Sequence, residues 1–129
     1  MRTLRPGSHA AILVRLAILA LTVATGLIHL SLGSLLFTFN GAGYLVAAVA
    51  MVLPIALAMR FRWLIRLGLV GYALTAIVGW YLMGPRYDVA YLAKVIEVGL
   101  IALLLLEIRS FDGNPVSRVR RTVAALVRA

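Results

Sequence analysis

Residues 89–106 read VAYLAKVIEVGLIALLLL, and only Lys94 and Glu97 in this stretch are charged. An α-helix rises about 1.5 Å per residue, so about 20 mostly apolar residues are enough to cross the hydrocarbon core of a bilayer. We therefore predict that this stretch crosses a membrane as one helix.

Three further apolar stretches precede it, at about 16–32, 35–59 and 67–83. Hydrophobic residues make up 64% of the 129 residues and charged residues 13%, which is more apolar surface than a soluble domain of this size can bury. Only Gly33 and Ser34 separate the first two stretches, which predicts a tight antiparallel hairpin. We expect residues 1–112 to form an all-α integral membrane four-helix bundle, with a bend at Pro54.

The positions of the arginines predict the topology. Arginines occur before the first stretch, between the second and third, and after the fourth, whereas the other side has only Arg86, which Asp88 offsets. Arginine-rich loops stay in the cytoplasm, so both termini are predicted to be cytoplasmic in a bacterial inner (plasma) membrane. The aromatic residues near the outer ends of the last two stretches resemble an interfacial belt: Trp80, Tyr81, Tyr87 and Tyr91.

The chain after the fourth stretch has a different pattern. Asn114 can cap a helix that has Pro115 in its first turn, and apolar residues then recur at helical spacing: Val116, Val119, Val123 and Leu126. Residues 113–129 are therefore predicted to form a short basic amphipathic helix on the cytoplasmic leaflet; the alternative is a solvated tail. The side chains expected to bind the anionic lipid surface are Arg118, Arg120, Arg121 and Arg128. With a formal net charge of +9, the chain is expected to have this leaflet, and not nucleic acid, as its charged partner.

Polar residues inside the apolar stretches form the candidate site. His29, Asn40, Tyr44, Lys94 and Glu97 all fall in the outer half of the predicted bundle. Ionisable groups inside a bilayer are costly, by about 2.5–3.5 kcal/mol at its centre, and are commonly functional. The pattern predicts a small-ligand, ion or proton site that opens to the outside. The alternative is a structural role, because Lys94 and Glu97 can neutralise each other and the other residues can bond neighbouring helices.

One inward-facing stripe is predicted for each helix, because helices in lipid associate through small residues and buried polar contacts. In chain order the stripes are Ile18, Thr22, Thr25 and His29; Asn40, Tyr44, Ala47 and Met51; Gly68, Tyr72, Thr75 and Gly79; and Ala90, Lys94, Glu97 and Ile101. The spacing of Gly71, Thr75 and Gly79 further predicts a helix–helix contact on the third helix.

Several chemistries are disfavoured by the residues present. The chain has no cysteine, which removes disulfides, thiol chemistry and Cys metal sites. No set of residues with metal-binding spacing is visible. Whether the protein binds a cofactor stays undecided, since His29 can offer only a single axial ligand to a haem or chlorophyll. No carboxylate pair and no Ser/His/Asp set lies at one depth, so an enzyme is the least favoured function.

Short motifs in the chain are GLIHL at residues 26–30, FNGAGY at 39–44, GPR at 84–86, and Glu97. Together they resemble those of small, largely uncharacterised bacterial four-helix membrane proteins, which are loosely DoxX-like in layout. The resemblance implies a bacterial inner membrane location and a four-helix fold, and it implies no activity.

Two functional hypotheses follow from these features. The first is a non-catalytic accessory or structural subunit of a larger membrane complex, because the chain is short and has almost no residues outside the predicted spans. The alternative is a small-ligand, ion or proton binding or transport protein that uses the polar cluster. The expected protein partners are subunits of a larger membrane complex or further copies of this chain.

Overall fold

The computed structural model describes residues 3–129, and its regular elements within that range are all helical. These elements are α1 (His9–Ser31), α2 (Leu35–Val52), α3 (Ala56–Arg60), α4 (Arg62–Met83), α5 (Asp88–Glu107), the π-helical turn η1 (Ile108–Asp112) and α6 (Pro115–Arg128). Four segments are long and apolar enough to cross a membrane: α1, α2, α4, and α5 continued by η1. The predicted all-α fold with four candidate spans is confirmed.

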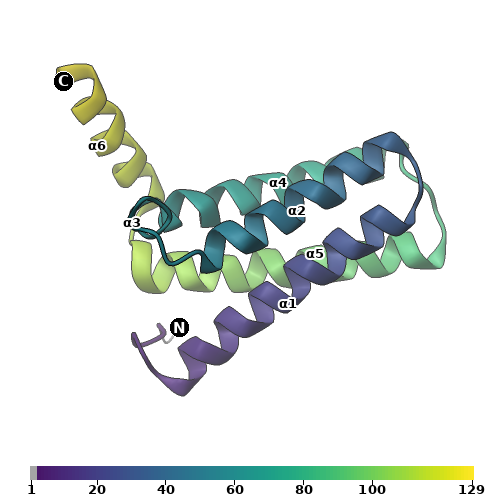
Figure 1. The fold of residues 1–129 in the computed structure, drawn as a ribbon, viewed down its shortest axis with the longest axis horizontal. Helices are drawn as coiled ribbons and strands as arrows, with labels where there is room; N and C mark the ends of the chain where they lie inside the picture. Colours follow the sequence, from purple (N-terminus) through teal and green to yellow (C-terminus); the bar gives the residue numbers. More distant parts are fainter. Residues whose placement is uncertain (1–2) are drawn as a thin grey trace.

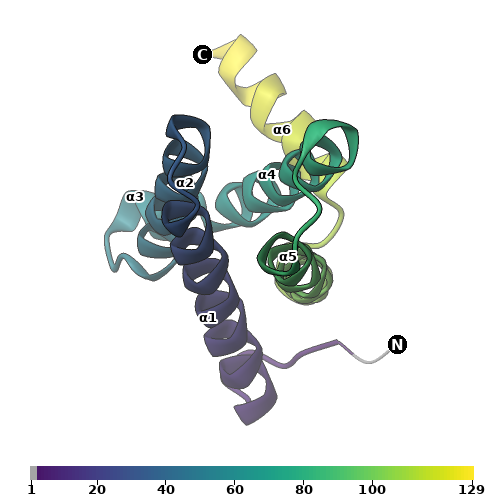
Figure 2. The same ribbon diagram turned by 90° about the vertical axis from the view of Figure 1, so that its right-hand side faces the viewer.

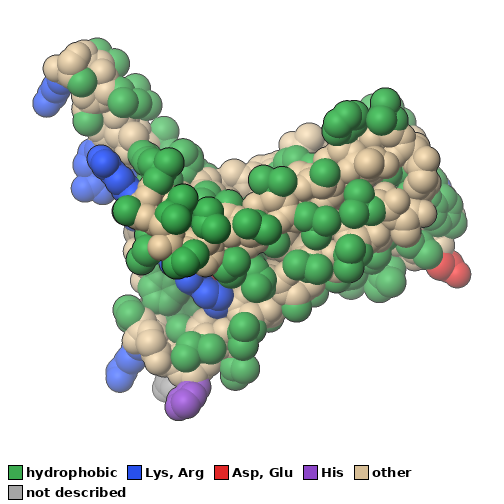
Figure 3. All heavy atoms as spheres, in the orientation of Figure 1, with side chains coloured by type: hydrophobic (Ala, Val, Ile, Leu, Met, Phe, Trp, Pro, Cys, Tyr) green, Lys and Arg blue, Asp and Glu red, His purple; other side chains and the backbone are tan. Residues whose placement is uncertain are grey.

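The four long helices form one bundle (Figures 1 and 2). The helices α1 and α2 make an antiparallel hairpin, α5 packs against α1 and α4, and α2 packs against α4. Both termini and α3 lie at one end of the bundle, here called the terminal end, and the α1–α2 and α4–α5 connections lie at the other, the hairpin end (Figure 1). Hydrophobic side chains cover the visible flank, and most visible Lys and Arg atoms lie towards the terminal end (Figure 3). This distribution fits a multi-pass membrane protein.

Polar side chains cap three of the helices at their first residues. The Ser8 and Ser34 hydroxyls accept hydrogen bonds from amides three residues later, at 3.1 and 3.2 Å. The Asn114 side chain accepts one from the Val116 amide at 3.0 Å, so the predicted cap of α6 is confirmed. These bonds satisfy amides that have no partner inside the helix. Between α1 and α2, Gly33 has a φ of +76°, which glycine adopts without steric cost and which closes the hairpin.

The second predicted span is shorter than expected. The helix α2 ends at Val52, residues 53–55 are not helical, and the short α3 begins at Ala56. Pro54 has no amide hydrogen and its ring crowds the preceding turn, so the helix ends where only a bend was predicted. Conversely, α1 and α4 begin earlier than predicted, at His9 and Arg62.

The helix α4 buries a different face from the one predicted. Gly68, Gly71 and Thr75 are exposed, and a Cβ atom added at Gly71 or Gly79 would meet nothing within 4 Å. The predicted contact through Gly71, Thr75 and Gly79 is therefore wrong within this chain. Larger side chains fill the bundle instead, because they bury more area and make more van der Waals contacts: Trp63, Arg66, Leu69, Val70 and Ala73.

The other helices largely bury the predicted stripes. All four predicted residues of α1 are buried, as are Tyr44 and Met51 of α2 and Ala90 and Glu97 of α5. The helices α1 and α2 approach closely at two glycines, since a Cβ atom at Gly41 would lie 2.6 Å from the Gly26 carbonyl oxygen. The core of the bundle lies between the two ends and includes Ile18, Met51, Leu69, Val70, Leu100 and Leu104.

Candidate functional site

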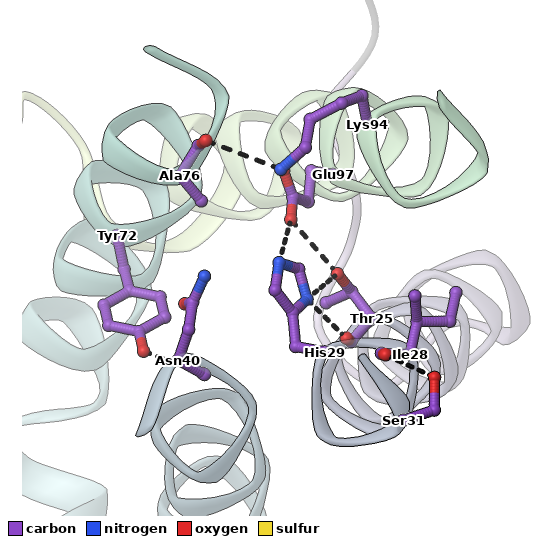
Figure 4. Close-up of polar contacts among 9 residues, drawn as sticks. All are labelled: Thr25, Ile28, His29, Ser31, Asn40, Tyr72, Ala76, Lys94 and Glu97. Atoms are coloured by element: carbon purple, nitrogen blue, oxygen red, sulfur yellow. Dashed lines mark hydrogen bonds and ion pairs between the residues drawn. The ribbon is translucent and has the colours of Figure 1, made fainter. Parts of the chain in front are cut away.

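A buried ionic cluster joins α1 and α5 towards the hairpin end (Figure 4). The Glu97 side chain is 0% exposed, and its Oε2 lies 2.7 Å from the Lys94 Nζ, one turn earlier on α5. Its Oε1 accepts a hydrogen bond from the Thr25 hydroxyl at 3.2 Å and lies 3.6 Å from the His29 Nε2. A carboxylate out of contact with water needs such partners, because burying an isolated charge is very costly.

His29 occupies the space between this carboxylate and the backbone of its own helix. Its Nδ1 lies 2.7 Å from the Thr25 carbonyl oxygen. A carbonyl can only accept, so Nδ1 carries a hydrogen and donates it. The second ring nitrogen, Nε2, is then the one directed at Glu97 (Figure 4). At 3.6 Å this nitrogen is beyond the length of a direct hydrogen bond to the carboxylate, so Thr25 and Lys94 are the groups that satisfy Glu97.

Tyr44, Tyr72 and Asn40 extend the cluster towards α2 and α4. The Tyr44 ring is fully buried, lies 5.6 Å from the His29 ring and meets the Tyr72 ring edge-on at 4.8 Å. The Tyr72 hydroxyl donates to the Asn40 backbone carbonyl at 2.8 Å. A Cβ atom at Gly43 would overlap that hydroxyl, so the glycine is what allows Tyr72 to reach α2. The Asn40 side chain points into the space between Tyr72 and His29 (Figure 4).

A cavity of about 540 Å³ at the hairpin end leads to this cluster. Its polar lining comes chiefly from His29, Asn40 and Lys94, and most of the remaining lining is apolar or aromatic. Lys94 is 11% exposed at its side chain and its Nζ lies 3.5 Å from the Ala76 carbonyl oxygen. At the margin of the cavity, Leu36 and Met83 are exposed. The polar groups are therefore collected on one side of a mainly apolar space.

Trp80 and the α4–α5 connection form the rim of the cavity. The Trp80 indole donates to the Pro85 carbonyl oxygen at 2.7 Å and packs edge-on against Tyr91 at 5.3 Å. The Arg86 guanidinium lies 4.2 Å from the Trp80 ring centroid, within the range of a cation–π contact. A Cβ atom at Gly84 would come within 2.6 Å of Trp80, so this turn can follow the indole closely only with glycine.

The structure thus gathers the residues singled out in the sequence, with different roles. His29, Lys94 and Glu97 make direct contacts, Tyr44 packs behind His29, and Asn40 lies across the cavity. Sequence reasoning placed Thr25 and Tyr72 only on packing stripes. Their hydroxyl bonds depend on how the helices are rotated, which the spacing does not determine.

A second ionic group, the arginine–carboxylate network, occupies the terminal end. Glu107 is 0% exposed, with Oε2 2.9 Å from the Arg66 Nε and Oε1 3.5 Å from the Arg15 Nε. Asp112 Oδ1 lies 2.7 Å from the Arg66 Nη1 and 3.7 Å from the Arg118 Nη1. Arg118, which was predicted to bind the anionic lipid surface, also takes part in this network, with 38% of its side chain exposed. The arginines come from three helices, α1, α4 and α6, and Arg66 takes part because α4 buries the face that carries it.

Within residues 3–129 there is no group of three or more His, Cys, Asp or Glu side chains that could hold a metal ion. Comparison of the chain with protein-family models, with curated proteins and with solved structures finds no match. The chemistry of the site is therefore argued from its own geometry.

Proposed function

We propose that this protein is a membrane-embedded binding protein for a small, largely apolar molecule that carries one hydrogen-bond-accepting or anionic group. The observation that carries the proposal is the cavity of about 540 Å³ with Lys94 and His29 on its polar side. Ligand pockets commonly have about 300–1,000 Å³, apolar walls and a few placed polar groups. The cavity has all three features.

The polar side of the cavity favours a ligand that accepts hydrogen bonds. The Lys94 ammonium has three donors, and only the one given to Glu97, at 2.7 Å, makes a short bond. A cationic ligand would meet this ammonium, whereas a carbonyl, hydroxyl or carboxylate oxygen would be attracted to it. Glu97 balances the charge of Lys94, which lets the ammonium stay in an apolar cavity.

The arginine distribution indicates from which side of the membrane the ligand enters the cavity. Under the positive-inside rule the terminal end faces the cytoplasm and the hairpin end faces outwards, in a bacterial inner membrane. A ligand then enters from the outer leaflet or from outside. Ion or proton transport would also need a path through the apolar core, so we propose binding and leave transport aside.

Trp80 provides the readout for a test, because it lines the cavity. The chain has two tryptophans, Trp63 and Trp80, so in a Trp63→Phe variant the tryptophan fluorescence comes from Trp80 alone. Nitroaromatic molecules quench tryptophan on contact, so purified protein is titrated with 4-nitrobenzoate and with 4-nitrobenzylammonium. Saturable quenching is expected with the anion and much weaker quenching with the cation, and Lys94→Met should remove the difference.

A matched pair of variants on α4 separates cavity binding from partition into detergent. Ala76→Phe fills the cavity, whereas Leu74→Phe places the same aromatic ring on the exposed side of the same helix. Ala76→Phe should lose the saturable quenching and Leu74→Phe should keep it. Equal quenching by both probes in every variant would overturn the proposal.

The hypothesis of an accessory subunit stays a prediction. Purification in mild detergent tests it, because a larger membrane complex would co-purify with the chain.

A further inference from the structure

A groove at the terminal end lies between α6 and the flank of α4. It is an open groove of about 750 Å³ and is almost entirely apolar apart from two arginines. Leu67 contributes from α4, and the residues from α6 are Val116, Val119, Arg120, Val123, Ala124, Val127 and Arg128. The groove is separate from the cavity at the hairpin end.

Contacts at the start of α6 fix its direction. Gly113 has a φ of +72°, which turns the chain sharply after η1. The Arg118 Nη1 lies 3.4 Å from the Asp112 carbonyl oxygen, and its guanidinium lies 5.2 Å from the Trp63 ring centroid. Both ribbon views show α6 leaving the bundle at a steep angle to the long helices (Figures 1 and 2). The helix therefore extends sideways over the space beside α4.

The two faces of α6 differ in chemistry. Its side towards the bundle is hydrophobic, and the Lys and Arg atoms visible on it lie on the opposite side (Figure 3). Val116, Val123 and Val127 are 74%, 52% and 80% exposed although they line the groove. The helix contains no Asp or Glu. Of its four arginines, Arg118 is the one with an ion pair among the described residues, to Asp112 at 3.7 Å, so the other three leave the helix positively charged.

We infer that this groove binds an anionic phospholipid of the leaflet at the terminal end. Leu67 lies five residues into α4, about 7.5 Å along the helix axis, in a segment that is long and apolar enough to cross a membrane. An acyl chain beside Leu67, Val119 and Val123 places the lipid phosphate near Arg120 and Arg128. These long side chains can keep their charge at the headgroup level while their stems cover apolar surface. A soluble occupant fits less well, because the groove is apolar and lies beside α4, one of the candidate membrane spans.

The absence of cysteine in the chain allows single-site spin labelling of the full-length protein. Val123→Cys places a nitroxide in the groove, and Ala125→Cys is the matched control half a turn away on the exposed side. Each variant is reconstituted into nanodiscs of phosphatidylglycerol or of phosphatidylcholine. In phosphatidylglycerol we expect oxygen to reach the Val123→Cys label better than a water-soluble nickel chelate, and the reverse for Ala125→Cys.

Lipid preference is measured separately by native mass spectrometry of the protein in an equal mixture of the two lipids. Arg120→Gln/Arg128→Gln should lower the preference for phosphatidylglycerol by about thirty-fold, since each arginine near an anionic surface is worth about a factor of five. The control Arg5→Gln, which removes an exposed arginine outside the groove, should keep the preference.

Three outcomes would overturn the inference. The first is a water-exposed Val123→Cys label in phosphatidylglycerol. The second is an unchanged lipid preference in Arg120→Gln/Arg128→Gln. The third is dipolar broadening between Val123→Cys labels, which would place a second copy of the chain in the groove.

Discussion

The partners of Glu97 lie on two helices, and each partner offsets the cost of burying its carboxylate in a different way. Lys94 neutralises its charge at 2.7 Å, and Thr25 donates a hydrogen bond at 3.2 Å. His29 lies 3.6 Å away with Nε2, beyond the usual length of a direct hydrogen bond. The ion pair is therefore the main compensation, and each of its members depends on the other.

Breaking this pair on one side should be costly. Glu97→Gln leaves the Lys94 ammonium without a counter-charge. Removing one partner of a buried ion pair lowers the free energy of unfolding by about 3–5 kcal/mol. The double variant Glu97→Gln/Lys94→Met removes both charges and should recover most of that loss. Thermal unfolding in detergent measures both, and a single variant as stable as wild type would contradict the ion pair.

Tyr44, which is fully buried, and Tyr72, which is partly buried, offer a second comparison at this scale. The Tyr44 hydroxyl lies near the Glu97 carboxylate but makes no well-formed hydrogen bond within the described residues, whereas the Tyr72 hydroxyl donates to the Asn40 carbonyl. Tyr44→Phe should therefore leave the free energy of unfolding unchanged or raise it, and Tyr72→Phe should lower it by about 1 kcal/mol. Equal losses in the two variants would mean that a bound water molecule satisfies Tyr44.

The residues of the hairpin-end cluster could be found in the sequence because they are polar in apolar surroundings. His29, Lys94 and Glu97 stand out for that reason. Glu107 and Arg66 could not be placed, because charges at the ends of a span are equally compatible with headgroups, water or the bundle interior. Their burial is decided by helix rotation, which depends on all neighbouring side chains together.

At the scale of the elements, a glycine of α2 lies in a helix–helix contact, whereas a glycine of α4 lies outside any contact. Gly41 lies against Gly26 of α1, where only a hydrogen atom fits, while Gly71 faces away from the bundle. Both glycines belong to patterns of small residues in the sequence, so spacing alone could not distinguish them. The existence and approximate extent of the helices could be predicted from hydropathy. The sequence also located a distortion at Pro54, but it predicted a bend where the helix in fact ends.

This difference gives a matched pair of substitutions. Gly41→Ala should destabilise the bundle by about 1–3 kcal/mol, because the new methyl group forces α1 and α2 apart. Gly71→Ala adds the same methyl group where no atom lies within 4 Å and should cause no loss. The two variants are compared by unfolding in detergent, and a larger loss for Gly71→Ala would restore the contact first predicted on α4.

Across the whole molecule, two buried carboxylates on α5 lie at opposite ends of an apolar core. Glu97 belongs to the cluster at the hairpin end and Glu107 to the arginine–carboxylate network at the terminal end. Each has a cavity beside it, of about 540 and 290 Å³. Between them lie fully buried side chains, including Ile18, Leu100 and Leu104. The one hydroxyl among them, on Thr22, already donates to the Ile18 carbonyl at 2.7 Å. Such a core offers water or ions few polar partners, so the two cavities should be reached from different sides.

Cysteine labelling in cells tests this separation together with the orientation. Thr75→Cys lines the cavity at the hairpin end, and Ile12→Cys lines the one at the terminal end; the parent chain has no cysteine that could react. Because arginine-rich ends stay inside, a membrane-impermeant maleimide should label Thr75→Cys in intact cells and Ile12→Cys only after permeabilisation. Labelling of both variants in intact cells would contradict the sealed core. The reversed pattern would keep the core and contradict the orientation, because the terminal end would then face outwards despite its arginines.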